Sequence, residues 1–358
     1  MIILGIETSC DETAVSLIKK TSDNVEVLSN AVSSQVELHA AWGGVVPNLA
    51  AREHLKNILP VLEESLSEAQ LTKDDVDLIS VTQGPGLIPA LLVGTNFAKT
   101  LSYLWKKPLI GIHHIEGHIY ANFIGRSDIN FPVLALVVSG GHTQLVLMRD
   151  HLNYEVVGET QDDAVGEAFD KVARTLDLGY PGGPIVSQKA EEFKSSQTSN
   201  PESQISLPRP MLNSPNFNFS FSGLKTAVLY KVKELKKSLS ADEFQRLIPE
   251  ICHEFQQACI DVLIHKTLKA TKKYSPKSIV IAGGVSANTE LKKQLEESVY
   301  EKFPEITYSN PDFTYSLDNA AMIASAASFR WGKMTEEQKA EATTNWKTLQ
   351  ANAGLSMN

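Results

Sequence analysis

One strand–turn–strand pattern occurs twice in this chain, once in each half. Residues 2–18 run as an apolar strand, a small polar turn and a second apolar strand, and residues 133–148 repeat that plan. Two apolar runs around a short polar turn indicate a β-hairpin. Its recurrence indicates an internal duplication. We therefore predict an α/β fold built from two related lobes.

The tips of both predicted hairpins suit an anionic ligand. The second tip, residues 139–143, reads Ser-Gly-Gly-His-Thr, and glycine and hydroxyl residues leave backbone N–H groups open to an anion. Such a pair of turns resembles the phosphate-binding loops of the actin, hexokinase and Hsp70 ATPase class, whose nucleotide lies between two lobes. The first tip adds Asp11 and Glu12, acidic residues that turns also favour for structural reasons.

Residues 113–118, His-His-Ile-Glu-Gly-His, hold three of the nine histidines. His114 and His118 stand four residues apart, so a helix places them on one face, where both can bind one metal ion. The apolar run 108–112 before them predicts a buried strand, and open α/β sheets bind ligands just beyond strand ends. Histidines satisfied by neighbouring groups remain the simpler interpretation of such spacing alone.

A zinc-protease helix is the familiar alternative for paired histidines. There, a glutamate directly after the first histidine acts as the general base. In this chain that position is Ile115, and Glu116 lies about 200° around the helix from His114. We expect Glu116 to point away from the pair, which removes the base that a protease needs.

Further segments continue the α/β pattern. Helices are predicted over 48–66, 90–104 and 163–178, and strands over 77–82, 217–223 and 278–282. Gly183 allows close approach of a ligand, and Asn288 follows a diglycine turn that suits an adenosine or simply a tight strand-to-helix connection. Asp318 is placed at a helix N-cap, a role that would explain it without any ligand. Residues 194–206 are predicted to form an exposed loop insertion.

Composition limits the class of partner. The 358 residues carry a formal net charge of −9, so the protein as a whole does not attract a phosphate backbone. A nucleic acid would need a local patch, and two lysine-rich stretches, 225–237 and 266–277, are available; solvated helix faces are the simpler explanation of both. No apolar run reaches the length of a membrane span, and three unpaired-looking cysteines fit a reducing compartment, so we expect a cytoplasmic protein.

Ten ordered motifs between residue 1 and about residue 330 resemble the bacterial TsaD family, the tRNA N6-adenosine threonylcarbamoyltransferases. The resemblance implies a duplicated two-lobed actin-like ATPase fold (ASKHA, RNase H-like) with its site in the interlobe cleft. The lobes would be residues 1–131 with about 320–345, and 132–319, followed by a polar tail at 346–358. The motifs lie at residues 5–13, 43–47, 84–86, 113–118, 139–143, 166–171, 182–184, 220–226, 283–288 and 318–319.

The resemblance also implies an activity. An acyltransferase of this family moves a threonylcarbamoyl group from threonylcarbamoyl-AMP to N6 of adenine 37 in tRNAs reading ANN codons, and ATP can occupy the adenylate site. The implied metal ligands are His114, His118 and Asp318, with Fe²⁺ favoured and Zn²⁺ as the alternative. Asp11 and Glu12 are candidates for the general base. The implied substrate contacts are Val138, Ser139, Gly140, Gly141, His142, Asp170, Gly183 and Asn288.

Partners follow from the same resemblance. They are tRNA, TsaB as a heterodimer partner, the ATPase TsaE, and TsaC as the source of the adenylate, with no membrane. The chain departs from the family pattern at Ser316 and Leu317, at its C-terminal segment and in the 194–206 insertion. An ATPase or small-molecule kinase of the same fold would not need the histidine pair. A non-catalytic scaffold would lack His114, His118 and Asp318.

Overall fold

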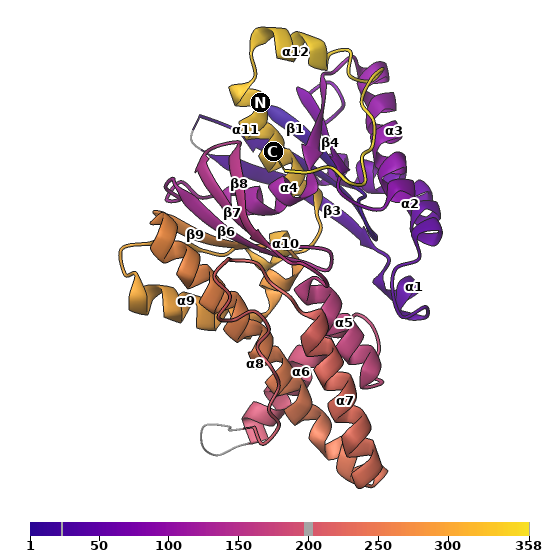
Figure 1. The fold of residues 1–358 in the computed structure, drawn as a ribbon. Helices are drawn as coiled ribbons and strands as arrows, with labels where there is room; N and C mark the ends of the chain where they lie inside the picture. Colours follow the sequence, from indigo (N-terminus) through magenta and orange to yellow (C-terminus); the bar gives the residue numbers. More distant parts are fainter. Residues whose placement is uncertain (23, 197–202, 358) are drawn as a thin grey trace. The chain divides into compact units, whose positions relative to one another are not determined.

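A computed structural model describes residues 1–22, 24–196 and 203–357. The chain forms two compact units (Figure 1). The first comprises Met1–Phe131, Met148–Tyr154 and Ser309–Asn358, and the second Pro132–Leu147 and Glu155–Tyr308. In the described residues, no helix is both long and apolar enough to cross a membrane.

The first unit is built on a five-stranded sheet in the order β3-β2-β1-β4-β5. β1 (Ile2–Glu7) and β2 (Glu12–Lys20) pair antiparallel, which confirms the first predicted hairpin. β3 (Val25–Ser34) extends the sheet beyond β2, and β4 (Leu78–Gly84) and β5 (Leu109–His113) continue it in parallel with β1. The carboxyl ends of β1, β4 and β5 therefore meet at one edge of the sheet, where ligands bind in such folds.

Helices cover both faces of this sheet. Leu4 and Ile6 of β1 join a core with residues of α2 (Pro47–Glu68) and α3 (Ile88–Trp105). Gly5, which points to the opposite face, lies against α11 (Ala320–Lys333), where an added Cβ would approach Ala320 O to 2.3 Å. The shorter helices are α1 (Val36–Ala40), α4 (His114–Tyr120), η1 (Ala121–Phe123), α10 (Phe313–Ser316) and α12 (Glu336–Ala342).

The second unit repeats the same strand order. Its sheet runs β10-β9-β6-β7-β8, so the β6–β7 hairpin takes the place of β1–β2 and β9 that of β4. This correspondence confirms the predicted duplication and its second hairpin. The strands are β6 (Val133–Val138), β7 (Thr143–Asp150), β8 (Asn153–Glu159), β9 (Ser278–Ala282) and β10 (Thr307–Ser309).

A large apolar core joins this sheet to the helices of the second unit. α8 is the longest of these helices and begins with a capping box formed by Ser240 and Glu243. The helices are α5 (Val165–Thr175), α6 (Gly182–Ser196), α7 (Ser222–Ser238), α8 (Ala241–Tyr274), η2 (Gly284–Ala287) and α9 (Thr289–Lys302).

Some predicted elements differ from those in the structure. The predicted strand 217–223 is reduced to one bridge between Phe219 and Thr160, because its alternating apolar residues pack into the core and α7 already begins at Ser222. The predicted insertion 194–206 begins inside α6, its residues 197–202 lie outside the described residues, and Ile205 is buried with its N–H bonded to Glu250. Packing also assigns residues 309–319 and 346–358 to the first unit, whereas the predicted lobes divided near residue 320 and ended in a separate tail.

Candidate metal centre and substrate turn

The two histidines of the predicted pair lie on one short helix. His113 ends β5 and caps α4, since its Nδ1 accepts a hydrogen bond from the Ile115 N–H. His114 and His118 then share one face of α4, as predicted, with ring centroids 4.6 Å apart. Both side chains are buried. The strand end and the helix together aim the two rings at one point.

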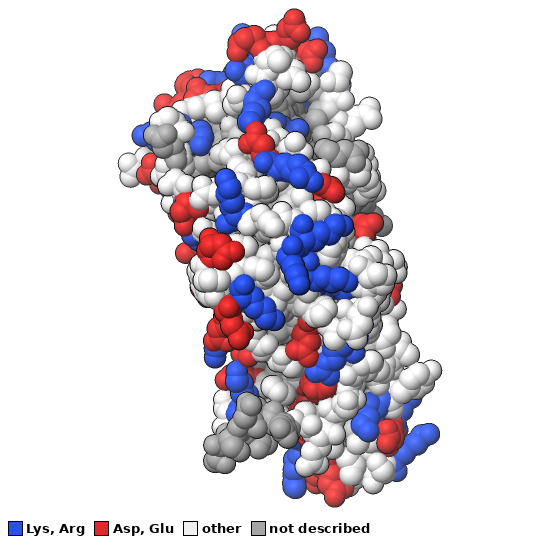
Figure 2. Space-filling view, turned by 60° about the vertical axis from the view of Figure 1, so that its left-hand side comes forward, with Lys and Arg blue, Asp and Glu red and all other residues white. Residues whose placement is uncertain are grey.

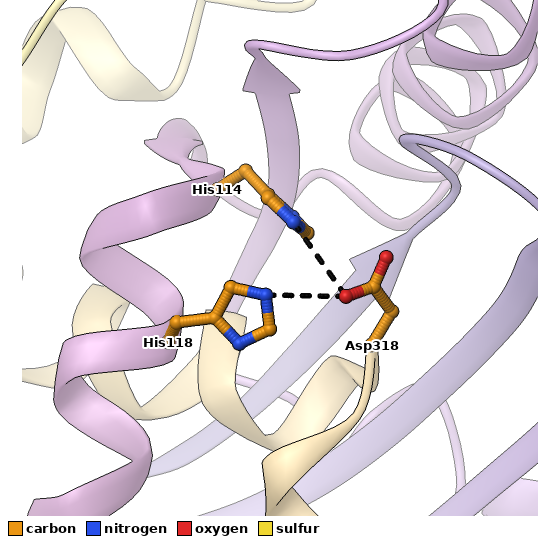
Figure 3. A group of neighbouring side chains, drawn as sticks. All are labelled: His114, His118 and Asp318. Atoms are coloured by element: carbon orange, nitrogen blue, oxygen red, sulfur yellow. Dashed lines mark ion pairs between the residues drawn. The ribbon is translucent and has the colours of Figure 1, made fainter. Parts of the chain in front are cut away.

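Asp318 completes the group (Figure 3). Its Oδ1 lies 3.1 Å from His118 Nε2 and 3.6 Å from His114 Nε2, and the three ligand atoms lie within 4.8 Å of one another. The prediction that Asp318 caps a helix is wrong: Asn319 caps α11 through its side chain, which accepts from the Met322 N–H. Because the neighbouring amide does the capping, helix formation does not explain the position of the aspartate.

A buried carboxylate, that of Glu7, fixes the orientation of His114. The Nδ1 of His114 donates to Glu7 Oε2 at 3.0 Å and lies 3.2 Å from Ser9 Oγ, which leaves the Nε2 of His114 facing Asp318. Thr82 on β4 donates to the same carboxylate oxygen, so Glu7 is itself held in place. Sequence reasoning placed Glu7 at a hairpin tip but did not assign it to the histidines. Its position at the end of β1, with only β4 between β1 and β5, was the available signal.

The electrostatics of the group favour a bound cation. Burial lowers the pKa of His114, but the charges of Asp318 and Glu7 outweigh it and raise that pKa to about 9. His118 is fully buried; its ring nitrogens make no well-aligned hydrogen bond within the described chain, and burial lowers its pKa. Two imidazole nitrogens and a carboxylate, oriented by a second carboxylate, match the ligands and outer partners of catalytic zinc and ferrous sites. The residues therefore fit a divalent ion.

Other acidic residues lie near Asp318. Asp11 is buried at the tip of the β1–β2 hairpin, and Glu12 accepts a hydrogen bond from Ser34 Oγ. Burial, followed by the charges of Asp11 and Asp318, raises the pKa of Glu12 well above its usual range. By contrast, Glu116 pairs with Arg330 Nη2 at 2.6 Å. This pairing confirms that Glu116 does not serve the histidine pair.

In the second unit, the predicted substrate residues gather around the β6–β7 turn. The Ser139 N–H donates to His142 O, and the Gly166 N–H, in the first turn of α5, donates to Ser139 O. Gly283 has a φ of +89°, and a Cβ there would lie 2.5 Å from Val138 O, so only glycine permits this approach. At Gly140 and Gly141 a Cβ would meet no atom of the described chain within 4 Å. The tip of the turn is therefore open.

Two further predicted contacts hold neighbouring segments. Asp170 Oδ1 accepts from the Gly182 N–H at 2.7 Å, which fixes the start of α6 next to Gly183. The side chain of Asn288 caps α9 by accepting from the Leu291 N–H, and its NH₂ group donates to Ser187 Oγ and Gln256 Oε1. Asn288 therefore has the structural role that the tight-turn interpretation required.

Fold and site together define a class: a duplicated α/β protein of the actin-like ATPase type whose first unit also carries a group able to hold one metal ion. A solved structure supports the fold. HypF from T. kodakarensis superposes with a TM-score of 0.59 at 12% identity, over 94% of this chain and 48% of that one. This chain thus corresponds to about half of HypF.

The chain belongs to the TsaD family, described as tRNA N6-adenosine threonylcarbamoyltransferase, whose profile matches residues 26–325. A relative of that name from Bacillus cereus is 47% identical over 99% of this chain and 96% of its own length. Another of that name, from Syntrophomonas wolfei, is 46% identical over 92% of this chain and 93% of its own length.

Proposed function

We propose that this protein transfers the threonylcarbamoyl group of threonylcarbamoyl-AMP to N6 of adenine 37 in tRNAs reading ANN codons, with release of AMP. The observation that carries the proposal is the buried group of His114, His118 and Asp318 in a chain of this family. A sugar kinase or ATP-driven chaperone of the same fold has no use for such ligands. A zinc protease would need a general base beside the histidine pair, and Glu116 cannot be that base because it is paired with Arg330.

The proposed chemistry starts from a weak nucleophile. The lone pair of the exocyclic amine of adenine is delocalised into the ring. The amine therefore attacks weakly, and the acyl carbon must be made more electrophilic. A divalent ion, Fe²⁺ in our proposal and Zn²⁺ as the alternative, would supply Lewis acidity when bound. His114, His118 and Asp318 would hold it, and Glu7 would keep His114 in the tautomer that presents Nε2. Asp11 or Glu12 would accept the amine proton, because a general base must lie within reach of the reacting group and Glu12, next to Asp11, lies close to Asp318.

The second unit would hold the AMP end of the adenylate, or ATP. Backbone N–H groups of Gly140 and Gly141 would donate to phosphate or carbamoyl oxygens, since a Cβ at either position would meet no described atom and the turn is open there. Val138 and His142 would support this turn from its two ends. Asp170, Gly183 and Asn288 would shape the pocket for the nucleoside. TsaC would supply the adenylate and TsaE the ATPase, in the cytoplasm, where the three free cysteines stay reduced.

We also propose TsaB as a direct partner, on the outer face of α2 and α3. These helices lie side by side in the first unit (Figure 1). Their outer face carries an exposed apolar stripe. Leu55 is 66% exposed and Leu92 is 47% exposed. Both line one hollow of about 350 Å³ between the helices, with Ile58, Val93, Asn96, Phe97 and Thr100. An exposed apolar surface of this kind marks a protein interface, and two parallel ridges suit helices from a partner.

Charge placed on this stripe is expected to prevent the heterodimer. The double change Leu55→Asp with Leu92→Asp should weaken TsaB binding by at least about 100-fold, because two apolar side chains that the partner would bury become carboxylates. Light scattering of the mixed proteins measures it. The control is Leu229→Asp on α7, also an exposed leucine, which should leave the complex intact. Unchanged binding by the double variant would remove this face as the interface.

The function itself is tested by transfer of labelled threonine from threonylcarbamoyl-AMP to unmodified ANN-reading tRNA, with partners present. We expect label in tRNA that is lost on chelation and returns with Fe²⁺ or Zn²⁺. An unmodified tRNA carrying guanosine at position 37 is the acceptor control and should take no label. ATP hydrolysis without any label in tRNA would contradict the proposal and favour an ATPase.

A further inference from the structure

The two lysine-rich stretches of the sequence have different surroundings. On α7, Lys225, Lys231 and Lys236 lie close to Asp163, Glu234 and Asp177 respectively, so their charges are partly neutralised. The stretch at the C-terminal end of α8 is different. Within the part of the chain that the structure describes, the lysines at 266, 269, 272 and 273 form no ion pair with a carboxylate. Positive charge is therefore concentrated there.

These α8 lysines border a pocket of about 440 Å³. Figure 2 shows a group of Lys and Arg side chains close together on one face of the molecule, with no acidic side chain inside the group. The volume lies within the usual range for a small-molecule-sized ligand, such as one nucleotide. The pocket is lined by Val157, Pro215, Asn216, Phe217, Lys269, Lys272, Lys273 and Tyr274.

Hydrogen bonds fix part of this charge beside the pocket. Lys266 is fully buried and donates to Ser214 Oγ at 2.6 Å and Asn216 O at 2.9 Å. Burial, together with repulsion from Lys269, lowers the pKa of Lys266 to about 8. Lys269 donates to Ser214 O and Pro215 O. The segment 214–216 is thus held by two ammonium groups, which fixes this wall of the pocket.

Aromatic rings complete the pocket wall. The rings of Phe217 and Tyr274 lie 5.8 Å apart, and the Lys273 ammonium is 5.2 Å from the first and 4.9 Å from the second. Lys272 and Lys273 are exposed, and Tyr274 is half-buried, so a ligand can reach both kinds of group. Phosphate-binding lysines beside an accessible ring are the combination with which proteins hold nucleotides of an RNA strand.

We propose that this pocket is a docking site for the substrate tRNA, with backbone phosphates on Lys269, Lys272 and Lys273 and an unstacked base against Tyr274. The proposal rests on tRNA being the acceptor, and it gives a protein of net charge −9 the local basic patch that such an acceptor requires. A free nucleotide could place one phosphate and one base in the same pocket. Lys269, Lys272 and Lys273, which form no ion pair with a described carboxylate, can hold several phosphates, and this favours a nucleic-acid strand over a single nucleotide.

The lysines and Tyr274 lie at the C-terminal end of α8, before β9 begins, whereas Gly283, which packs against Val138 at the β6–β7 turn, follows the end of β9. The length of β9, about 13 Å at about 3.3 Å per residue, therefore separates these groups along the strand. The lysines therefore cannot act on the adenine that reacts while they also hold phosphates here. They would contribute to tRNA affinity and leave the chemical step unchanged.

The test compares two charge reversals with the same effect on net charge. Lys272→Glu with Lys273→Glu alters the pocket, and Lys233→Glu with Lys237→Glu alters exposed positions of α7. For the pocket variant we expect the KM for tRNA to rise about tenfold or more, with kcat at saturating tRNA unchanged. The slope of log Kd against log salt should fall by about two. The α7 variant should change both quantities far less.

Tyr274→Leu is the second arm, because it removes the ring while keeping an apolar side chain against Phe217. We expect weaker tRNA binding by about tenfold, with unchanged thermal unfolding. Equal losses in the two charge variants would show that net charge alone acts, and would overturn the proposal. So would pocket variants that bind tRNA normally, or that lose AMP binding and not tRNA binding. Loss of transfer in every variant and in the unaltered protein would instead contradict the transferase function.

Discussion

Replacing His118 with alanine is expected to remove both metal binding and threonylcarbamoyl transfer. His118 is fully buried, and its Nε2 lies 3.1 Å from Asp318 Oδ1. Alanine leaves His114 and Asp318 as the only ligands of the group. Loss of an outer partner already costs about 10- to 100-fold in metal affinity, and loss of a direct ligand costs more. We therefore expect metal affinity and transfer rate each to fall by more than about 100-fold.

The control for this prediction is another buried histidine of the same segment. His113 caps α4 and donates from Nε2 to Leu355 O, so it faces away from the ligand group. His113→Asn keeps a capping acceptor and should retain the metal. Metal content after dialysis, and the visible spectrum of the Co²⁺-substituted protein, report the result without an activity assay. A His118→Ala protein that binds Co²⁺ as tightly as the unaltered chain would contradict the assignment.

Periodicity made the fold and the histidine pair predictable from sequence. The hairpins at 2–18 and 133–148 alternate short apolar runs with polar turns, and the i, i+4 spacing of His114 and His118 needs only a helix to become a ligand pair. Asp318 was harder, because Asp and Asn both cap helices and residues 318–319 are Asp-Asn. Which of the two caps is decided by how the chain enters α11, and no local pattern encodes that.

Contacts made through the backbone were also beyond sequence reasoning. Residues 346–357 read as a polar tail, yet the Asn352 N–H donates to Gln83 O and Leu349 packs against the core of the first unit. Any side chain can accompany a backbone hydrogen bond, so the sequence carries no sign of it. A different reason hid the partner of Glu7, which is a side chain. A carboxylate at a strand end is common, and only the order β1-β4-β5 brings it to His114.

Arg330→Ala is expected to cause the second large effect, on stability and metal affinity together. Glu116 on α4 is 1% exposed, and Arg330 on α11 donates to its Oε2 at 2.6 Å. α4 carries two of the metal ligands, and α11 begins two residues after the third. Removing one partner of a buried pair costs about 3–5 kcal/mol. Because the Arg330 side chain is 38% exposed, solvent screens part of this cost, and we expect about 2–3 kcal/mol.

A matched pair of variants separates this effect from a general loss of charge on α11. Lys333→Ala removes an exposed partner of Asp150 on the same helix and should cost about 0–1 kcal/mol. Urea unfolding measures the free energies, and Co²⁺ titration measures metal affinity, which we expect Arg330→Ala to lower by about 10- to 100-fold. Adding Glu116→Gln to Arg330→Ala should restore part of the stability, because no buried charge is then left without a cation. If Arg330→Ala and Lys333→Ala prove equally mild, or if Glu116→Gln brings no recovery, the ion pair does not hold α4 against α11.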